Sequence, residues 1–535
     1  MKVEFLGATH EVTGSCTYLN VADKNILVDC GMEQGRDVFE NTLPPVNANE
    51  IDYVILTHAH VDHSGNLPLI YKQGFRGTVI TTKETANLCE IMLRDCAFIQ
   101  ESEAKFKSRK AKRAGKPEVE PLYTLEDAEG VLGLMRPCDY LEVVTVDESI
   151  SLRFTDIGHL LGSGAVELWL TEGEVTKKIV FSGDVGNTNQ PIINDPSFVK
   201  EADFVVCEST YGNRLHNAKR QNSVDVLASV IQRTLDRGGN LIIPSFAVGR
   251  TQEMLYFIRE IKEKGLVKNH HNFPVYVDSP LANEATAIYL QCDTSCLDEE
   301  FRAVMQDGNN PLWFEGLNMA VTSDESRQLN LNNTPKVIIS ASGMCEAGRV
   351  CHHLKYNLWR KECTVLFVGY QAEGTLGRKI HDGAESVRLF GDEIAVNCEI
   401  CELIGVSGHA DKEGLLNWLK GFEKKPSLVF VNHGDDDAVR DFTEAVEQEI
   451  GVKAFAPFSG TSYDLLKGEF IEITEGVPVK QRNSAQKQYA SPLQKTLVAS
   501  AKKLLALAEG SGGIPNKDMR KLTEEIERLI GEYRR

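Results

Sequence analysis

The sequence predicts an α/β protein in which a domain with a parallel sheet is inserted into a strand-rich domain. Residues 1–210 consist of short strand-like runs with few helices, and residues 211–384 alternate strand with helix. Strand-rich runs resume in residues 385–480, and residues 481–535 are expected to form a C-terminal helical extension. Alternation of strand and helix is typical of a parallel sheet covered by helices, so the middle segment is the predicted insertion.

The first strand-rich segment is built of runs rich in β-branched and aromatic residues, separated by turn residues. In chain order the expected strands are KVEFLG, SCTYLNV, NILVDCG and IDYVILT, and further on ISLRFTD, AVELWLT, KKIVFSG and FVVCEST. Residues 83–100, between these two groups, have the spacing of a helix.

In the middle and C-terminal segments, expected strands alternate with expected helices. Residues 223–237 and 250–264 have helical spacing, and NLIIPSF, PVYVDSP, KVIISASG and CTVLFVGY are expected to be strands. The later strand-rich runs are EIAVNCEICELIGVSGH and SLVFVNHG, each followed by a helix. Two amphipathic helices are expected around residues 493–508 and 518–533. Their apolar spacing favours docking on the chain's own body, with a homodimer as the second possibility.

Composition places the chain among globular proteins of a reducing compartment. Of its 535 residues 42% are hydrophobic and 25% are charged, which excludes a disordered chain and a coiled-coil rod. No apolar run approaches the roughly 18 residues that span a bilayer, so no membrane contact is expected. The 13 cysteines are an odd number scattered along the chain, which argues against a disulfide framework and favours the cytoplasm.

Charge limits the nucleic-acid partners that the chain can have. A net charge of −19 argues against non-specific coating of nucleic acid, but it allows an enzyme with a local basic groove. Residues 105–116 hold seven basic residues in twelve. They either border a substrate channel or form a solvated helix face, and charge alone does not separate these two interpretations.

The densest chemical signal is the run His58-Ala59-His60-Val61-Asp62-His63, directly after an apolar strand. Three imidazoles and a carboxylate within six residues cannot share one face of a regular element. A loop at the end of a strand lets them diverge around two centres. Zinc takes imidazole nitrogen and carboxylate oxygen, and catalytic zinc sites keep one position open for water. The run therefore predicts a metal site.

Four further strands end in a residue of the same chemical type at a glycine-containing turn: Asp29, His159, Asp184 and His433. Each of them taken alone would be an ordinary structural residue. Together they recur as an apolar strand that delivers a metal-type ligand, which is the pattern expected when one edge of a sandwich holds a site.

These residues resemble the metallo-β-lactamase fold hydrolases, whose hallmark is H-x-H-x-D-H followed by a later His, an Asp and a C-terminal His. The runs CESTYG (207–212), VSGHAD (406–411) and NHGD (432–435) are similar to motifs A, B and C of the β-CASP subfamily of RNA-processing nucleases. PSFAVGRTQE and SASGM in the middle segment are similar to that subfamily's extra domain. Asp435 departs from the H-G-E that the last motif often shows, keeping the carboxylate but shortening its reach.

The resemblance covers nearly all of residues 1–475 and implies both a fold and a cofactor. The implied fold is an αββα metallo-β-lactamase sandwich with an inserted parallel-sheet (β-CASP) domain. The implied cofactor is a pair of zinc ions. Carried over by motif, the ligands are His58, His60 and His159 for the first ion, Asp62, His63 and His433 for the second, and Asp184 between both. Asp29 is expected to orient ligands or water from outside the ligand set, and Asp62 and Asp29 are also counted among the catalytic residues.

The resemblance also implies a histidine that acts as general acid. His409 in VSGHAD is similar to that residue, with Glu208 hydrogen-bonded to it. A carboxylate partner raises the pKa of an imidazole, so the imidazolium persists near neutral pH. The alternative is a buried histidine that caps a turn. Arg250, Ser342 and Arg378 lie in or beside glycine-containing turns and are either contacts for the substrate backbone or parts of ordinary turns.

The expected function is that of a zinc-dependent phosphodiesterase that hydrolyses single-stranded RNA, with a hydroxide held between two zinc ions as nucleophile and His409 as acid. A DNA nuclease and a small-molecule hydrolase on the same metal core are alternatives, since no residue identifies a reader of the 2′-hydroxyl. An inactive RNA-binding scaffold is a further alternative, but such scaffolds lose ligands and every ligand is present here.

Overall fold

The structure is a computed structural model that describes residues 1–34, 38–216, 223–372, 374–479 and 516–533. The chain divides into two compact units, residues 1–478 and residues 479–535, and each is described by itself. Among the described helices, none combines the length and the apolar character needed to cross a membrane.

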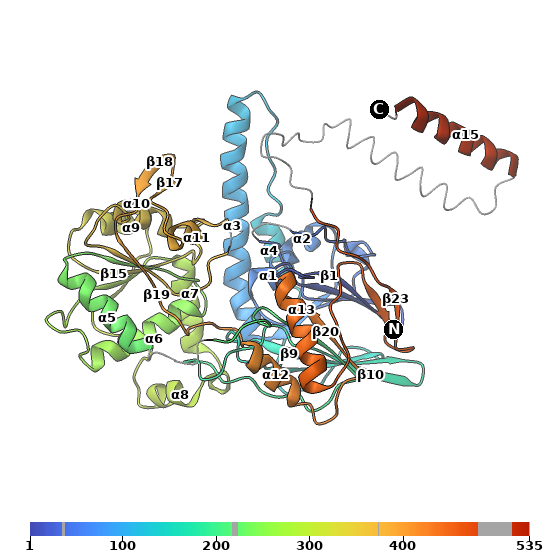
Figure 1. The fold of residues 1–535 in the computed structure, drawn as a ribbon, viewed down its shortest axis with the longest axis horizontal. Helices are drawn as coiled ribbons and strands as arrows, with labels where there is room; N and C mark the ends of the chain where they lie inside the picture. Colours follow the sequence, from blue (N-terminus) through green and yellow to red (C-terminus); the bar gives the residue numbers. More distant parts are fainter. Residues whose placement is uncertain (35–37, 217–222, 373, 480–515, 534–535) are drawn as a thin grey trace. The chain divides into compact units, whose positions relative to one another are not determined.

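Two sheets packed face to face carry all the predicted metal ligands. The first has eight strands in the order β23-β22-β1-β2-β3-β4-β5-β6, and the second has seven in the order β21-β20-β11-β10-β9-β8-β7 (Figure 1). The first sheet comprises β1 (Lys2–Gly7), β2 (Cys16–Val21), β3 (Lys24–Val28), β4 (Tyr53–Ile55), β5 (Thr78–Thr82), β6 (Met135–Cys138), β22 (Ser462–Asp464) and β23 (Glu469–Glu472). The second comprises β7 (Val144–Thr145), β8 (Ile150–Asp156), β9 (Gly164–Glu172), β10 (Val175–Phe181), β11 (Phe204–Glu208), β20 (Leu428–Asn432) and β21 (Ala454–Phe455).

Apolar side chains fill the space between the two sheets and the space beneath the helices on their outer faces. Phe5, Phe154 and Phe430 belong to the buried cluster between the sheets. The outer helices are α1 (Val61–Ser64), α2 (Leu67–Lys72), α3 (Lys83–Arg113) and α4 (Leu125–Leu132) beside the first sheet, and α12 (Lys412–Lys420) and α13 (Asp436–Ala445) beside the second. The expected αββα sandwich is confirmed.

The middle segment forms a separate parallel sheet of six strands in the order β14-β13-β15-β12-β16-β19. Its strands are β12 (Leu241–Pro244), β13 (Val275–Val277), β14 (Leu317–Met319), β15 (Val337–Ser340), β16 (Thr364–Phe367) and β19 (Glu399–Glu402). Its helices are α5 (Ser223–Asp236), α6 (Arg250–Glu263), α7 (Pro280–Gln291), α8 (Glu299–Gln306), α9 (Ser323–Leu331), α10 (Val350–Asn357) and α11 (Leu376–His381). The expected inserted α/β domain is confirmed as a fold.

The strand pairing differs from the expected return to the first domain at residue 385. The hairpin β17 (Ser386–Leu389) and β18 (Asp392–Ala395) comes first, and β19 then pairs in parallel with β16 of the inserted sheet. The chain re-enters the sandwich sheets only at β20, which pairs with β11. The β-rich run after residue 385 therefore contributes an edge strand, β19, to the inserted sheet. Strand propensity alone does not determine which sheet a strand joins.

Helix α3 is longer than the sequence analysis expected. It was expected to end near residue 100, but it continues through the basic run to Arg113. Glu101 pairs with Lys105 and Glu103 with Lys107, one turn apart, and such pairs support an exposed helix. Gly115, with a positive φ of 65°, follows the end of the helix.

The C-terminal unit contains one described helix, α15 (Asn516–Tyr533), which agrees with the helix expected over residues 518–533. The helix expected around residues 493–508 lies outside the described residues, as does much of the predicted extension 481–535.

Strand polarity brings the predicted ligands to one edge of the sandwich. β3 pairs in parallel with β4, and β10, β11 and β20 are parallel neighbours, so their carboxyl ends lie together. Asp29 follows β3, His58 lies just beyond β4, Asp184 lies just beyond β10, Glu208 closes β11 and His433 follows β20. The carboxyl ends of parallel strands are where α/β sheets place their sites.

A close backbone crossing at Gly31 fixes the short helix α1, which carries Asp62. The Ser15 N–H donates to the Asp62 carbonyl oxygen over 2.8 Å, and the Gly31 N–H donates to the Ser15 carbonyl oxygen over 2.9 Å. A Cβ on Gly31 would lie 1.7 Å from the Asp62 carbonyl oxygen and 2.7 Å from the Ser15 nitrogen. Only glycine permits this approach.

We therefore expect Gly31→Ala to lower the midpoint of thermal unfolding by roughly 5 °C or more, because the added methyl group forces the backbone apart. Gly133→Ala is the matched control, since a Cβ there meets nothing nearer than 3.5 Å and the backbone is already helical with φ −65°. Scanning calorimetry measures both. Equal midpoints for the two variants would contradict the account of the crossing.

Candidate active site

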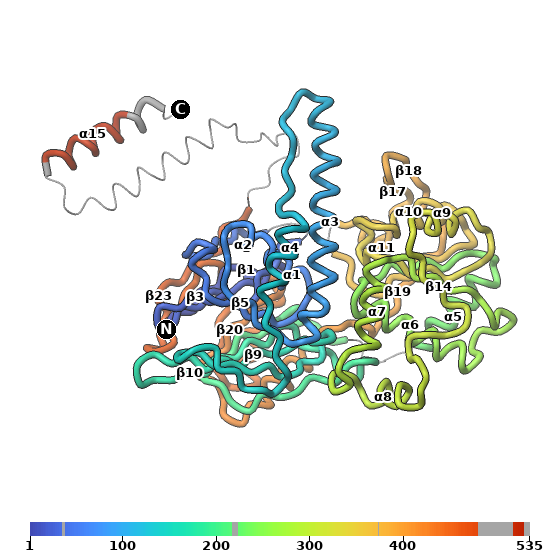
Figure 2. Tube along the Cα trace, turned by 180° about the vertical axis from the view of Figure 1, so that it is seen from behind, coloured from blue at the N-terminus to red at the C-terminus, as the bar shows by residue number. Residues whose placement is uncertain are grey.

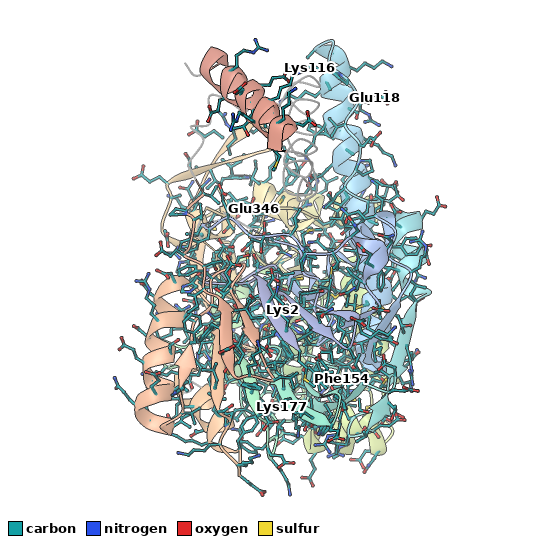
Figure 3. The ribbon with its side chains drawn as sticks, turned by 90° about the vertical axis from the view of Figure 1, so that its right-hand side faces the viewer. Lys2, Lys116, Glu118, Phe154, Lys177 and Glu346 are labelled. Atoms are coloured by element: carbon teal, nitrogen blue, oxygen red, sulfur yellow. The ribbon has the colours of Figure 1, made fainter. Side chains whose placement is uncertain are left out.

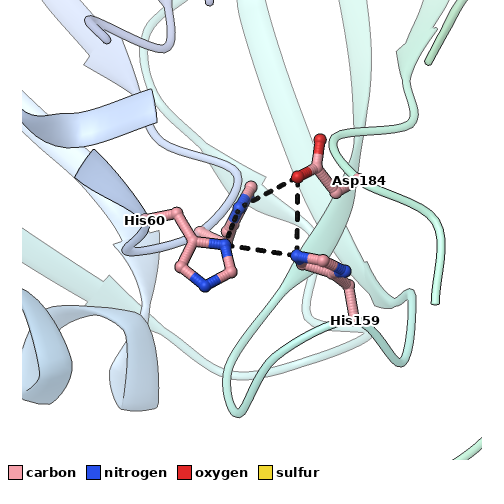
Figure 4. A group of neighbouring side chains, drawn as sticks. His60, His159 and Asp184 are labelled. Atoms are coloured by element: carbon pink, nitrogen blue, oxygen red, sulfur yellow. Dashed lines mark hydrogen bonds and ion pairs between the residues drawn. The ribbon is translucent and has the colours of Figure 1, made fainter. Parts of the chain in front are cut away.

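Three histidines and one carboxylate oxygen converge on one point at the sheet edge (Figure 4). The His60 Nδ1 lies 3.0 Å from the His58 Nε2 and 3.2 Å from the His159 Nε2. The Asp184 Oδ2 lies 3.5 Å from the His58 Nε2 and 3.4 Å from the His159 Nε2. The four atoms come from three separate strand ends, so the sheets bring them together.

The hydrogen bonds of these histidines leave their converging nitrogens free to be ligands. The His58 Nδ1 lies 3.1 Å from the Thr57 hydroxyl, and the His159 Nδ1 lies 3.3 Å from the Gly408 carbonyl oxygen, to which it donates. The proton is therefore on Nδ1 in His159, and the Nε2 lone pair points inward. Burial lowers the pKa of His58, His60 and His159, so all three are neutral near pH 7.

A second set of ligand atoms faces the other oxygen of the same carboxylate. The His63 Nε2 lies 3.0 Å from the His433 Nε2, and the Asp62 Oδ2 lies 3.7 Å from the His433 Nε2. The Asp184 Oδ1 lies 3.3 Å from the His63 Nε2 and 3.7 Å from the His433 Nε2. Asp184 thus presents one oxygen to each set.

Asp29 fixes the orientation of His63. Its Oδ2 lies 2.7 Å from the His63 Nδ1 and 3.1 Å from the Ser15 hydroxyl, while the Thr57 N–H donates to its Oδ1 over 2.9 Å. Burial lowers the pKa of His63, but the charges of Asp184 and Asp29 outweigh burial and hold this pKa well above its usual range. Asp29 therefore turns the His63 Nε2 toward the second set.

The two sets fit divalent cations. The Asp184 Oδ1 is buried and has no hydrogen-bond partner among the described residues, a costly state for a carboxylate unless a cation satisfies it. The ligand separations of the first set, 3.0–3.5 Å, are close to the edge of roughly 3.3 Å of a tetrahedron with bonds of about 2.0–2.1 Å. A cavity of about 30 Å³, lined by His63, Asp184 and His433 among others, adjoins the second set.

His409 lies beside the first set and is held by Glu208. The His409 Nδ1 lies 3.2 Å from the Glu208 Oε1, and its ring centroid lies 4.4 Å from that of His159. The buried Glu208 carboxylate also accepts the backbone N–H groups of Val185 over 2.6 Å and Thr210 over 3.1 Å. Burial lowers the pKa of His409, but the charge and hydrogen bond of Glu208 outweigh burial and raise it to about 9.

Four contacts around the site were not expected from the sequence. Thr57 and Ser15 hydrogen-bond Asp29, and the Thr210 hydroxyl lies 3.3 Å from the His433 Nδ1. The His216 Nε2 donates to the His409 carbonyl oxygen over 2.9 Å and so braces the loop of motif B against that of motif A. A sequence signal for Thr57 and Thr210 was present, because Thr57 precedes His58 and Thr210 lies in motif A, whereas His216 has no sequence signature.

The inserted domain approaches the site through Gly249 and Tyr370. A Cβ on Gly249, the residue before Arg250, would lie 3.1 Å from the Leu160 side chain, which follows His159. Burial raises the pKa of Tyr370, the Asp435 carboxylate adds to this rise, and the charges of Arg214 and Arg378 oppose it. Tyr370, which follows β16 of the inserted domain, therefore lies near the motif C loop and near Arg214, whose guanidinium is 6.0 Å from the centre of its ring.

The three residues predicted to contact substrate have different surroundings in the structure. Arg378 lies on α11 and forms an ion pair with Asp382 over 2.7 Å. It is close enough to Tyr370 for its charge to lower the pKa of that phenol. Arg250 begins α6 and is nearly buried in an ion pair with Glu253. The Ser342 hydroxyl donates to the Ala347 carbonyl oxygen over 3.4 Å, and among the described contacts it makes none with the predicted ligands.

Three sequence families match successive parts of the chain. Residues 11–233 match the metallo-beta-lactamase superfamily, residues 251–380 match the Beta-Casp domain, and residues 393–457 match the Zn-dependent metallo-hydrolase RNA specificity domain. The second and third matches follow the first along the chain, in the order that the resemblance in the sequence implies.

Curated relatives extend these matches over most of the chain. It is 36% identical over 441 residues to Ribonuclease TTHA0252 of Thermus thermophilus, which covers 82% of this chain and 94% of the relative. It is 33% identical over 473 residues to transcription termination factor FttA of Methanosarcina mazei, which covers 85% of this chain and 70% of the relative. The chain therefore belongs to the β-CASP family of metallo-β-lactamase fold hydrolases, and it is a metal-dependent enzyme of that family.

Proposed function

We propose that this chain is a zinc-dependent ribonuclease that hydrolyses phosphodiester bonds in single-stranded RNA with two zinc ions. The observation that carries the proposal is the Asp184 carboxylate, whose two oxygens each face a separate set of histidine ligands, 3.3–3.7 Å away. Ribonuclease TTHA0252 and the RNA specificity match support RNA as the substrate.

Each ligand set supplies the donor types that zinc prefers. His58, His60 and His159 with the Asp184 Oδ2 would hold one ion, and Asp62, His63 and His433 with the Asp184 Oδ1 would hold the other. Paired zinc ions ionise a water molecule near neutral pH and neutralise the charge that develops on a phosphate in hydrolysis. Asp29 would contribute indirectly, by accepting the proton of the His63 Nδ1 and so aiming the Nε2 at the site, where a cation would take the place of the Nε2 proton.

His409 is suited to donate the proton that the leaving oxygen needs. Its side chain is 22% exposed, whereas those of His58, His63, His159 and His433 are at most 6% exposed. The Nδ1 donates to Glu208, so the Nε2 is the atom that can transfer a proton to a substrate in the site. Glu208 stabilises the imidazolium and fixes the plane of the ring.

The inserted domain favours an extended substrate over a small molecule. Tyr370, 44% exposed, lies near Asp435 and Arg378, beside the loop that carries His433. With a second domain beside the site, an RNA strand could be contacted from two sides. Arg378 is the predicted residue best placed to bind the phosphate backbone of that RNA.

A direct test of the function is incubation of the zinc-loaded protein with end-labelled single-stranded RNA and with DNA of the same sequence. We expect cleavage of the RNA and much weaker cleavage of the DNA. Cleavage of DNA at an equal or higher rate would assign the chain to DNA, and cleavage of neither would remove the nuclease proposal.

The ligand sets predict the metal content. Protein purified without chelator should carry close to two zinc ions per chain by elemental analysis, because each set offers at least three protein ligands. Removal of the metal by a chelator should abolish hydrolysis, and addition of zinc should restore it. A stoichiometry of one in fully active protein would contradict the two-ion assignment.

Replacement of His409 and replacement of His433 are predicted to have different effects on metal content and turnover. His433→Ala should lose metal, because the ring supplies a ligand nitrogen. His409→Ala should keep both metals and the fold, yet lose about 10²–10⁴ in turnover, the usual contribution of a positioned general acid. Elemental analysis and steady-state hydrolysis of RNA measure the two effects.

A substrate with a good leaving group provides the control for this pair. A nitrophenyl phosphodiester needs no proton on its leaving oxygen, so the deficit of His409→Ala should shrink on it while that of His433→Ala persists. If His409→Ala loses zinc, or is equally impaired on both substrates, the residue is a ligand or a structural residue.

Glu208 is predicted to set the alkaline limit of activity. The acid must be protonated, so turnover should fall as pH rises through the pKa of His409, which Glu208 raises. Bound cations would lower that pKa, but the direction of the Glu208 effect is unchanged. Glu208→Gln should therefore move the alkaline limb of the kcat–pH profile to lower pH, and His409→Ala should abolish it. An unmoved limb in Glu208→Gln would disprove the coupling.

A further inference from the structure

The outer half of α3 is an exposed cationic and aromatic arm that the catalytic centre does not use. Helix α3 stands between the sandwich and the inserted domain, and its C-terminal half continues beyond α7 (Figures 1 and 2). Lys116 and Glu118 lie at its outer end (Figure 3). At 1.5 Å per residue, the helix extends roughly 45 Å from Lys83 to Arg113.

The lower half of α3 is anchored at the active site and against α7. The Thr82 and Thr85 hydroxyls donate to the Gly162 carbonyl oxygen, three residues after His159, over 2.6 and 2.9 Å. The Asp293 N–H, just beyond α7, donates to Glu84 over 3.1 Å, and Asp95 lies close enough to Glu284 of α7 for their charges to interact. α7 therefore runs antiparallel to the lower half of α3.

The face of α3 that meets α7 continues outward as an exposed stripe. Counting in steps of three and four residues from Asp95, the same face carries Ile99, Phe106, Arg109 and Arg113, with Lys110 beside them. Ile99 is 39% exposed and Phe106 is 70% exposed. An exposed aromatic ring set among arginines needs an explanation that packing among the described residues does not supply.

Most cations of this arm form no ion pair with any residue that the structure describes. Lys105 and Lys107 pair with Glu101 and Glu103 one turn earlier. Among the residues that the structure describes, no ion pair involves Arg109, Lys110, Lys112, Arg113 or Lys116, although Glu118 and Glu120 follow in the chain. The helix dipole accounts for basic residues in the last turn, but not for Arg109, Lys116 or the exposed Phe106.

We propose that the stripe Ile99, Phe106, Arg109, Lys110 and Arg113 is a docking arm that holds single-stranded RNA outside the active site. The inference rests on the proposed ribonuclease function. Five cations without an ion pair among the described residues, in a chain of net charge −19, complement a polyanion. An exposed aromatic ring beside arginines is the combination on which bases stack. The stripe shares the face of α3 that meets the inserted domain, so a strand leaving the site along α3 would reach it.

The arm predicts a dependence on substrate length. Full-length protein carrying His409→Ala, to prevent cleavage, is titrated with single-stranded RNA of about six or about thirty nucleotides. The short RNA fills the site alone, and only the long RNA reaches the arm. Arg109→Gln with Arg113→Gln should weaken binding of the long RNA and reduce the slope of log affinity against log salt by about 1.4, at about 0.7 per phosphate contact. Binding of the short RNA should be unchanged.

Matched variants separate arm contacts from general charge. Lys361→Gln with Arg388→Gln removes two exposed charges from the inserted domain and should leave the salt slope for long RNA nearly unchanged. Phe106→Tyr should bind like the parent, whereas Phe106→Leu should bind long RNA at least about fivefold more weakly, because leucine keeps the apolar surface but cannot stack. Circular dichroism verifies that α3 remains folded in each variant.

The possible outcomes distinguish the arm from the proposed function. If the zinc-loaded wild type cleaves RNA but the arm variants bind long and short RNA like the parent, the arm proposal is wrong and the ribonuclease proposal stands. If the wild type neither binds nor cleaves RNA, both are wrong. If Phe106→Leu and Phe106→Tyr leave RNA binding unchanged and instead convert a dimer to a monomer by light scattering, the stripe is an interface with a second copy and the RNA proposal is overturned.

Discussion

The structure of the site depends on one buried carboxylate. Asp184 lies between two sets of histidine nitrogens, and its Oδ1 has no hydrogen-bond partner among the described residues. Burial opposes its ionisation, yet the neighbouring imidazoles, His433 first among them, hold its pKa well below the usual range. A buried charge needs positive partners, because removing either partner of a buried ion pair is strongly destabilising, and the histidines on both sides of Asp184 are placed to supply them directly or through a bound cation. The ligand loops are organised around this constraint.

The fold places the predicted ligands at strand ends, and hydrogen bonds from neighbouring residues hold them in position. Asp29 and His433 adopt positive φ angles of 61° and 52°, which non-glycine residues seldom adopt and which are found mostly where the surroundings enforce them. Hydrogen bonds from Thr57 and Ser15 secure Asp29, and the backbone of Ala8 accepts the His433 N–H over 2.8 Å. Glu208 and His216 hold His409 in the same manner, so the predicted metal ligands and the predicted general acid lie at one edge of the sheets.

The sequence predicted the local features well, because their signals are local. The H-x-H-x-D-H run, the apolar strands that end in Asp or His and the strand–helix alternation each depend on neighbouring residues. The alternation predicted the insertion, and the family resemblance that the motifs carry implied the sandwich. The long-range pairing of β19 with β16 of the inserted sheet was not predictable from strand propensity, and the local ion pair of Arg250 with Glu253 within α6 was missed. The helix was expected to end near residue 100, but ion pairs one turn apart support α3 beyond that point.

The most direct test of the account is a calorimetric titration of zinc into metal-free protein carrying Asp184→Asn. If the Asp184 carboxylate serves both ligand sets, this single change should weaken both binding events and leave the near-isosteric side chain packed as before. His433→Ala, which alters one set only, is the comparison and should weaken one event alone. Retention of one binding event at wild-type affinity in Asp184→Asn would show that the carboxylate does not join the two sets, and would contradict the account.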